Sequence, residues 1–162
     1  MSPFRLASFV LFVRDMDISK KFYQDLLGQE IAMDLGLNVG FTSGLGLWKK
    51  DYAQKVIFGC DQPSGEGNDT EVYFETEKID EAWEKIRAQG VEVIHEIREQ
   101  PWCQRVFRVR DPDQFIVEIA EPMDAVVRRL HNEGFSKEEI VKKTLMPQDV
   151  ITAILESGGV TR

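Results

Sequence analysis

The chain has 162 residues, of which 43% are hydrophobic and 30% charged, so it is long enough to bury the core of one domain or of two small fused units. Its formal net charge of −8 and its pI near 4.9 argue against a surface for nucleic acid or an anionic membrane, because both need clustered positive charge. Its two cysteines are too few for a disulfide framework, which favours a reducing cytoplasm. We therefore expect a cytoplasmic globular protein whose partner is a small molecule or another protein.

The first half of the chain predicts a strand, a helix and a group of short strands. The apolar run SFVLFV at 8–13 is too short to span a membrane and is typical of a first strand. Ile18, Phe22 and Leu26 then recur at helical spacing before Gly28. Further strand candidates follow at 30–33, 39–42, 45–49 and 55–60.

The second half repeats this order. EVYFET at 71–76 predicts a strand, and Ile79, Trp83 and Ile86 lie at helical spacing before Gly90. Strand candidates follow at 91–97, 104–110 and 115–120, and the polar segment 62–69 links the two halves. Each half is therefore interpreted as a βαβββ module.

A sheet of this size with one helix covers only one of its faces, so the other face must close against something. The second module is the natural partner. Two such sheets placed edge to edge would curl into an open cup whose concave face is lined by alternate strand residues. We expect an α+β fold in which paired βαβββ modules form this cup-shaped sheet, followed by C-terminal helices.

One carboxylate lies inside a predicted strand. In the segment 108–121, RVRDPDQFIVEIAE, residues 111–113 supply a turn, and Glu118 then stands between Val117 and Ile119. A charge among such neighbours is costly unless it is paired, hydrogen-bonded, metal-bound or directed into a wet cavity. Glu118 is therefore the first candidate for a functional residue.

The ordered combination of motifs resembles the vicinal oxygen chelate superfamily, which includes glyoxalase I, bleomycin-resistance proteins and extradiol dioxygenases. The residues that resemble its first module are Leu11, Val13, Asp15, Ser19, Phe22, Tyr23, Leu27 and Gly28. The segment 100–119 resembles the closing hairpin of its second module. The resemblance implies a domain at 1–122 with modules at about 4–61 and 69–122.

The resemblance also implies four metal-ligand positions, which fall on Ser8, Gly46, Glu71 and Glu118. A catalytic divalent ion needs at least three protein ligands and an open position. A hydroxyl and two carboxylates are a poor set for zinc and a conceivable one for magnesium or manganese, whereas Gly46 offers no side chain. We expect a degenerate site, in which a divalent metal is possible but not favoured. Alternatively, Arg108 pairs with Glu118 or Glu71 and no metal is needed.

Two acids that face one cavity would raise the pKa of at least one of them, which makes Glu118 the candidate catalytic acid or base. By strand alternation, Phe12, Trp48 and Tyr73 share the concave face with the acids, and Trp102 lies at the rim. Rings beside acids suit an organic ligand with polar or cationic groups. The predicted ligand-binding residues are Phe12, Trp48, Glu71, Tyr73, Trp102, Arg108 and Glu118.

Some of these residues fit ordinary packing equally well. Trp48 and Tyr73 would be core residues if the strand faces were offset by one position, and Trp102 could fill a gap. Trp83, in its apolar helical register, is expected in the core. A catalytic cysteine needs a base close to its thiol, and nothing in the sequence indicates that His95 lies near Cys103.

The sequence pattern of the C-terminal extension, residues 123–162, predicts three short helices. Gly134 separates the first two, Ser136 and Glu139 form a capping box, and Pro147 begins the third. The pattern resembles a helix-turn-helix, but its basic and acidic residues balance, unlike those of a DNA-binding element. We expect an accessory bundle that packs on the cup or on a second subunit.

Three functions are compatible with these features. The first is a small-molecule-binding protein with a degenerate metal site. The second is a metal-dependent lyase, isomerase or dioxygenase that uses Glu118 and Glu71. The third is a regulatory module in which occupancy of the cup alters the C-terminal helices. A homodimer is expected in each case, and a membrane or nucleic-acid partner is not.

Overall fold

The computed structural model describes residues 3–26, 28–59, 68–110 and 114–157. Its elements, in chain order, are β1 (Arg5–Val13), α1 (Met16–Lys20), the π-helical turns η1 (Lys21–Leu26), β2 (Ile31–Asp34), β3 (Asn38–Phe41), β4 (Leu45–Lys49), α2 (Lys50–Phe58), β5 (Thr70–Glu75), α3 (Ile79–Arg87), β6 (Val93–Glu99), β7 (Arg105–Arg110), β8 (Ile116–Ala120), α4 (Met123–Asn132), α5 (Lys137–Thr144) and α6 (Gln148–Glu156). Among the described helices, none is both long and apolar enough to cross a membrane.

The eight strands form one mixed sheet in the order β2-β3-β4-β1-β5-β8-β7-β6. Each module contributes four strands in the same internal order, and the modules join where β1 pairs antiparallel with β5. This arrangement confirms the α+β fold with paired βαβββ modules. The predicted turn at 111–113 and most of the predicted linker lie outside the described residues.

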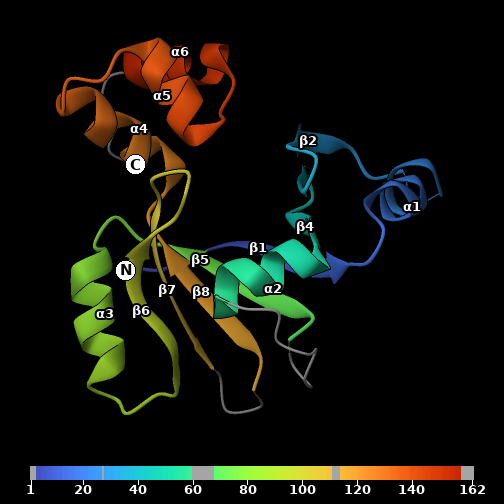
Figure 1. The fold of residues 1–162 in the computed structure, drawn as a ribbon, viewed down its shortest axis with the longest axis horizontal. Coiled ribbons are helices and arrows are strands. Elements are labelled where there is room, and N and C mark those ends of the chain that lie inside the picture. The colour runs from blue at the N-terminus through green and yellow to red at the C-terminus, as the bar shows by residue number, and fades with distance from the viewer. Residues whose placement is uncertain (1–2, 27, 60–67, 111–113, 158–162) are drawn as a thin grey trace.

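Helices pack on both faces of this sheet. On one face α3 buries Ile79 and Ala82 against Phe107, Val109 and other strand residues, and Trp83 meets the Phe107 ring edge-on. Trp83 is therefore part of the packing beneath its helix, as its spacing predicts. On the opposite face α2 lies across the sheet (Figure 1).

The helix α2 corrects the sequence analysis, which predicted a strand at 55–60. The segment instead forms a helix that ends at Gly59, whose left-handed backbone (φ 76°) lets its N–H donate to the Lys55 carbonyl. Ala53 and Ile57, one turn apart, are fully buried on the face turned to the sheet. A short apolar run of this length fits a strand or a helix, and here the tertiary packing decides.

The first helix also differs from its prediction. Ile18 and Phe22, which helical spacing places on one face of that helix, are 68% and 48% exposed. The backbone widens into π-helical turns after Lys20, which changes the periodicity. Met16 and Tyr23 pack on the sheet in place of the predicted pair.

The C-terminal helices form a small bundle beyond the turn between β6 and β7 (Figure 1). Its core contains Val126, Val127, Leu130, Ile140, Met146 and Ile151. The predicted capping box at the start of α5 is confirmed, because Ser136 and Glu139 each accept a backbone N–H of the other residue.

Candidate functional site on the concave face

Strand register brings five polar side chains into one row across the sheet. Paired positions run from β1 to β6 through Ser8, Tyr73, Glu118, Arg108 and His95, each residue opposite the next. Residues opposite one another in register lie on the same face of a sheet. Because Ser8 belongs to the first module and the other four residues to the second, the row crosses both modules.

Arg108 is the centre of this row. Its Nε donates to Glu71 Oε2 at 3.1 Å, its Nη2 donates to Glu118 Oε2, and its Nη1 lies 3.2 Å from His95 Nε2. The arginine is 1% exposed, and the two glutamates are 3% and 6% exposed. Charge-assisted hydrogen bonds of this kind offset part of the cost of burying the ions.

The environment shifts the pKa of two groups in opposite directions. Burial, with the charge of Glu71 nearby, raises the pKa of Glu118 to about 8, although the Arg108 guanidinium opposes the shift. Burial lowers the pKa of His95 to about 4, and the positive charge of Arg108 adds to the effect. The raised pKa makes Glu118 a group of this site that can take up or release a proton near neutral pH, whereas His95 is neutral there.

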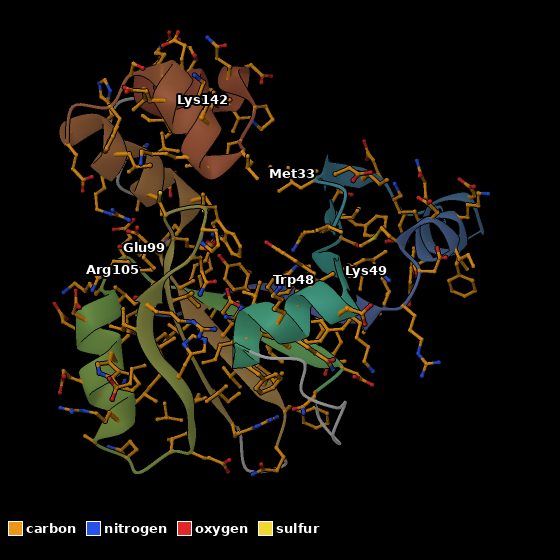
Figure 2. The ribbon with its side chains drawn as sticks, in the orientation of Figure 1. Met33, Trp48, Lys49, Glu99, Arg105 and Lys142 are labelled. Atoms are coloured by element: carbon orange, nitrogen blue, oxygen red, sulfur yellow. The ribbon has the colours of Figure 1, made fainter. Side chains whose placement is uncertain are left out.

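Aromatic side chains cover the charged group. The Arg108 guanidinium lies 5.8 Å from the centroid of the Trp48 ring, which in turn meets Phe12 and Trp102 edge-on. Trp48 lies beside α2 (Figure 2), and it also contacts the ring of Tyr52 on that helix. Phe12 and Trp48 are 7% and 5% exposed, so they are packed beneath α2 in this conformation.

A second hydrogen-bonded chain begins at the turn between β6 and β7. Trp102 Nε1 donates to Gln104 Oε1 at 2.8 Å, and Gln104 Nε2 donates to the Tyr73 hydroxyl at 3.0 Å. Tyr73 donates onward to Glu75 at 3.0 Å. Burial and the charge of Glu118 raise the pKa of Tyr73, which therefore stays protonated at neutral pH.

The sequence predicts that the concave face is open to solvent, but in the structure the helix α2 covers it. Arg98 of β6 donates to the carbonyls of Val56 and Ile57 in the last turn of α2. The buried face of α2 also carries Gln54, whose Nε2 has no hydrogen-bond partner among the described residues. An unpaired buried amide is costly, so this donor marks a place where a polar ligand atom would be stabilised.

The implied metal site does not fit the residues that occupy it. Arg108 already places a positive charge between Glu71 and Glu118, and Gly46 offers no donor. Within the described residues, no three histidine, cysteine, aspartate or glutamate side chains are placed to hold a metal ion. The Glu118–Arg108–Glu71 arrangement is the metal-free alternative that the sequence left open.

All seven predicted ligand-binding residues lie in or beside this cluster. The sequence analysis missed three participants: His95 as the third partner of Arg108, Gln104 as the link between Trp102 and Tyr73, and Arg98 as the anchor of α2. Alternation along 104–110 puts Gln104 on the same face as Arg108, but nothing in the sequence indicates the hydrogen bonds that Gln104 makes. Cys103 lies in the core of the C-terminal bundle, whereas His95 bonds Glu96 and Arg108 on the sheet.

Comparisons with known proteins agree with this fold. The family model described as a glyoxalase-like domain matches residues 6–124 and so ends as α4 begins. The protein YraH of Bacillus subtilis (strain 168) is 26% identical over 124 residues, which cover 71% of this chain and 96% of YraH. A crystal structure of a protein of unknown function from Agrobacterium tumefaciens str. C58 is 36% identical, covers 73% of this chain and 94% of its own, and has a TM-score of 0.36.

A glyoxalase/bleomycin resistance protein/dioxygenase superfamily member from Vibrio splendidus 12B01 has a TM-score of 0.52 at 18% identity, with 73% of this chain and 97% of that chain covered. This likeness supports the fold. The family match spans most of the chain, and the C-terminal helices lie almost wholly beyond it. The chain therefore belongs to the glyoxalase-like domain family of the vicinal oxygen chelate superfamily, followed by a C-terminal helical bundle.

Proposed function

We propose that this protein binds an organic molecule on its concave face without a metal ion. The observation that carries the proposal is the position of the Glu71–Arg108–Glu118 cluster beneath the Trp48 ring and beside the Trp102 ring. Two glutamates against one guanidinium favour a ligand with a hydrogen-donating group, or with a cationic group that draws off the Glu118 proton. The neighbouring indole rings favour a ligand with a planar ring.

Binding requires movement of α2. Arg108, Glu118 and Trp48 are nearly inaccessible beneath this helix. The helix is held by its buried side chains Ala53 and Ile57, by the bonds from Arg98 and by the ion pair of Lys50 with Asp69 at 2.7 Å, and none of these contacts is a backbone bond of the sheet. A ligand ring would take the place of α2 side chains against Trp48.

Tryptophan fluorescence tests the proposal, because the chain has only three tryptophans. In a Trp83→Phe background, the two remaining reporters are Trp48 and Trp102, both at the site. Ethidium, a planar aromatic cation, should quench this emission saturably, and the anionic ring probe anilinonaphthalene sulfonate should bind more weakly. Adding Trp48→Phe should remove most of the response. Unsaturable quenching, or equal binding of both probes, would contradict the proposal.

The metal-dependent enzyme has less support than metal-free binding. A metal ion between Glu71 and Glu118 would have to displace the Arg108 guanidinium, which is fully buried and bonded to both. We therefore assign no reaction step to a metal ion.

A regulatory function is the second candidate, because one turn touches both the site and the bundle. In the turn between β6 and β7, the Trp102 ring meets Trp48, while the adjacent Cys103 packs into the core of the bundle. Arg129 of α4 holds the same turn by donating to the Cys103 carbonyl at 2.7 Å. A ligand that moves Trp102 would therefore move Cys103.

Thiol labelling tests this coupling. In a Cys60→Ser background Cys103 is the only thiol, and its burial should make its reaction with a disulfide reagent slow. Saturating ethidium should change that rate severalfold. An unchanged rate, with ethidium binding retained in the fluorescence assay, would remove the regulatory function and leave the binding function standing.

A further inference from the structure

Three side chains of metal-ligating type converge on the Arg108 guanidinium from three strands. Glu71 comes from β5, Glu118 from β8 and His95 from β6, and each bonds a different guanidinium nitrogen. The register places His95, Arg108 and Glu118 opposite one another, so the backbone fixes this convergence. One imidazole and two carboxylates directed at one cation form a set that divalent transition metals accept.

The orientation of His95 supports the same interpretation. Its Nδ1 lies 2.8 Å from the carbonyl oxygen of Glu96, which can only accept, so Nδ1 carries the proton. Its Nε2 is then unprotonated and accepts from Arg108. Metal-ligating histidines are held in this way, with one ring nitrogen donating to a backbone carbonyl and the other free to bind the ion.

We propose that the Arg108 guanidinium is an internal substitute for a divalent cation, and that His95, Glu71 and Glu118 become a divalent-metal site when the guanidinium is removed. The native chain is metal-independent because its own side chain supplies the cation. The expected ion is a first-row divalent metal such as Co²⁺ or Zn²⁺, because the set includes an imidazole.

The geometry explains why the guanidinium excludes a metal ion from the native site and why its removal would admit one. The guanidinium keeps its three partners on separate nitrogens, too far apart for bonds of about 2.0–2.2 Å to one ion. Truncation at Arg108 leaves a space between the donors, and the flexible glutamates can swing inward. Water would complete the coordination, and the Trp48 ring, 5.8 Å from the guanidinium carbon, closes one side of the space.

The experiment compares wild type with Arg108→Ala, both freed of metal by chelator. Titration with Co²⁺, followed by calorimetry and by the visible absorption of the ion, should show one ion per chain in the variant and none in wild type. Adding Glu118→Gln should weaken binding at least tenfold, as should adding His95→Ala. Arg128→Ala with the same treatment is the matched control, since its partner Asp124 is exposed, and it should bind no Co²⁺.

Folding of the variant is measured in the same samples. If Arg108→Ala is unfolded in chelator, one equivalent of Co²⁺ should restore its circular dichroism, because an ion that binds only the folded state stabilises it. The inference is overturned if folded Arg108→Ala binds no ion, if Co²⁺ restores no structure to an unfolded variant, or if wild type binds one ion in a Glu118-dependent manner.

Discussion

Arg108 and Glu118 lie directly opposite each other on the antiparallel strands β7 and β8, and their side chains form an ion pair in the interior. This relationship explains how a strand of β-branched residues tolerates a carboxylate at its centre. The pair does not stand alone, because Glu71 on β5 bonds the same guanidinium. The cluster therefore ties three strands of the second module together.

Removing the cation should cost more stability than removing any other charge on the sheet. Arg108→Ala leaves two buried glutamates without their cationic partner, and we expect a loss of about 3–5 kcal/mol in the free energy of unfolding. Adding Glu71→Gln and Glu118→Gln should recover part of that loss, because neutral amides need no counter-ion. Denaturant unfolding measures each variant.

A matched control uses the exposed pair of Arg128 and Asp124 on α4. Arg128→Ala should change the free energy of unfolding by less than about 1 kcal/mol, because water screens this pair. Equal losses for Arg108→Ala and Arg128→Ala would show that the buried cluster contributes no special stability.

The pH dependence of stability should show the raised pKa of Glu118. The folded chain holds this proton up to a pKa of about 8, whereas the unfolded chain releases it near 4.5, so the contribution is lost as the pH rises toward 8. His95 acts in the opposite sense: with its pKa lowered from 6.5 to about 4, its contribution is present above pH 6.5 and is lost as the pH falls.

Between pH 6.5 and 8, the Glu118 contribution changes while that of His95 is constant. Wild type should therefore lose stability across this window, and Glu118→Gln should show a flatter profile. The measurement is a set of urea titrations at several pH values. Parallel profiles for the two proteins would mean that Glu118 is already ionised in the folded state.

Loosening α2 should strengthen ligand binding on the concave face. Arg98 donates to two carbonyls in the last turn of α2, where helix carbonyls lack partners and the dipole favours a cation. Arg98→Ala should lower the free energy of unfolding by about 1–3 kcal/mol and speed amide exchange in α2. If α2 must move for ethidium to bind, the affinity should rise severalfold.

Arg87→Ala is the control, because Arg87 pairs with Glu84 on the surface of α3 and does not touch the concave face. It should leave ethidium affinity unchanged. A lower affinity in Arg98→Ala would mean that α2 is part of the binding surface and not its cover.

The sequence was sufficient to predict the paired modules, because periodicity specifies their elements locally, and the resemblance to the superfamily implied the inward direction of Glu118. It was not sufficient for α2, since a short apolar run fits either a helix or a strand until packing against Phe12 and Trp48 decides. The pairing of Arg108 with the two glutamates was one of the predicted alternatives, but the approach of His95 to Arg108 depends on strand register, which single-sequence patterns do not fix. The homodimer and the ligand remain predictions.

The backbone of Cys103 offers a test of how the bundle is joined to the cup. Cys103 has a positive φ of 66°, a conformation that costs an L-residue with a side chain about 1 kcal/mol or more and glycine little. Cys103→Ala and Cys103→Gly both remove the buried thiol from the bundle core, but only glycine relieves the strain. We expect the glycine variant to be more stable than the alanine variant by about 1 kcal/mol.

The control is a position at which alanine should be more stable than glycine. Ala125 lies within α4, where the backbone is helical, so Ala125→Gly should lower the free energy of unfolding by about 1 kcal/mol. Both Cys103 variants should also speed amide exchange in α4, because the thiol no longer anchors the bundle. If alanine at 103 proved as stable as glycine, the turn would have to relax to negative φ, and the link between Trp102 and the bundle would be softer than the structure indicates.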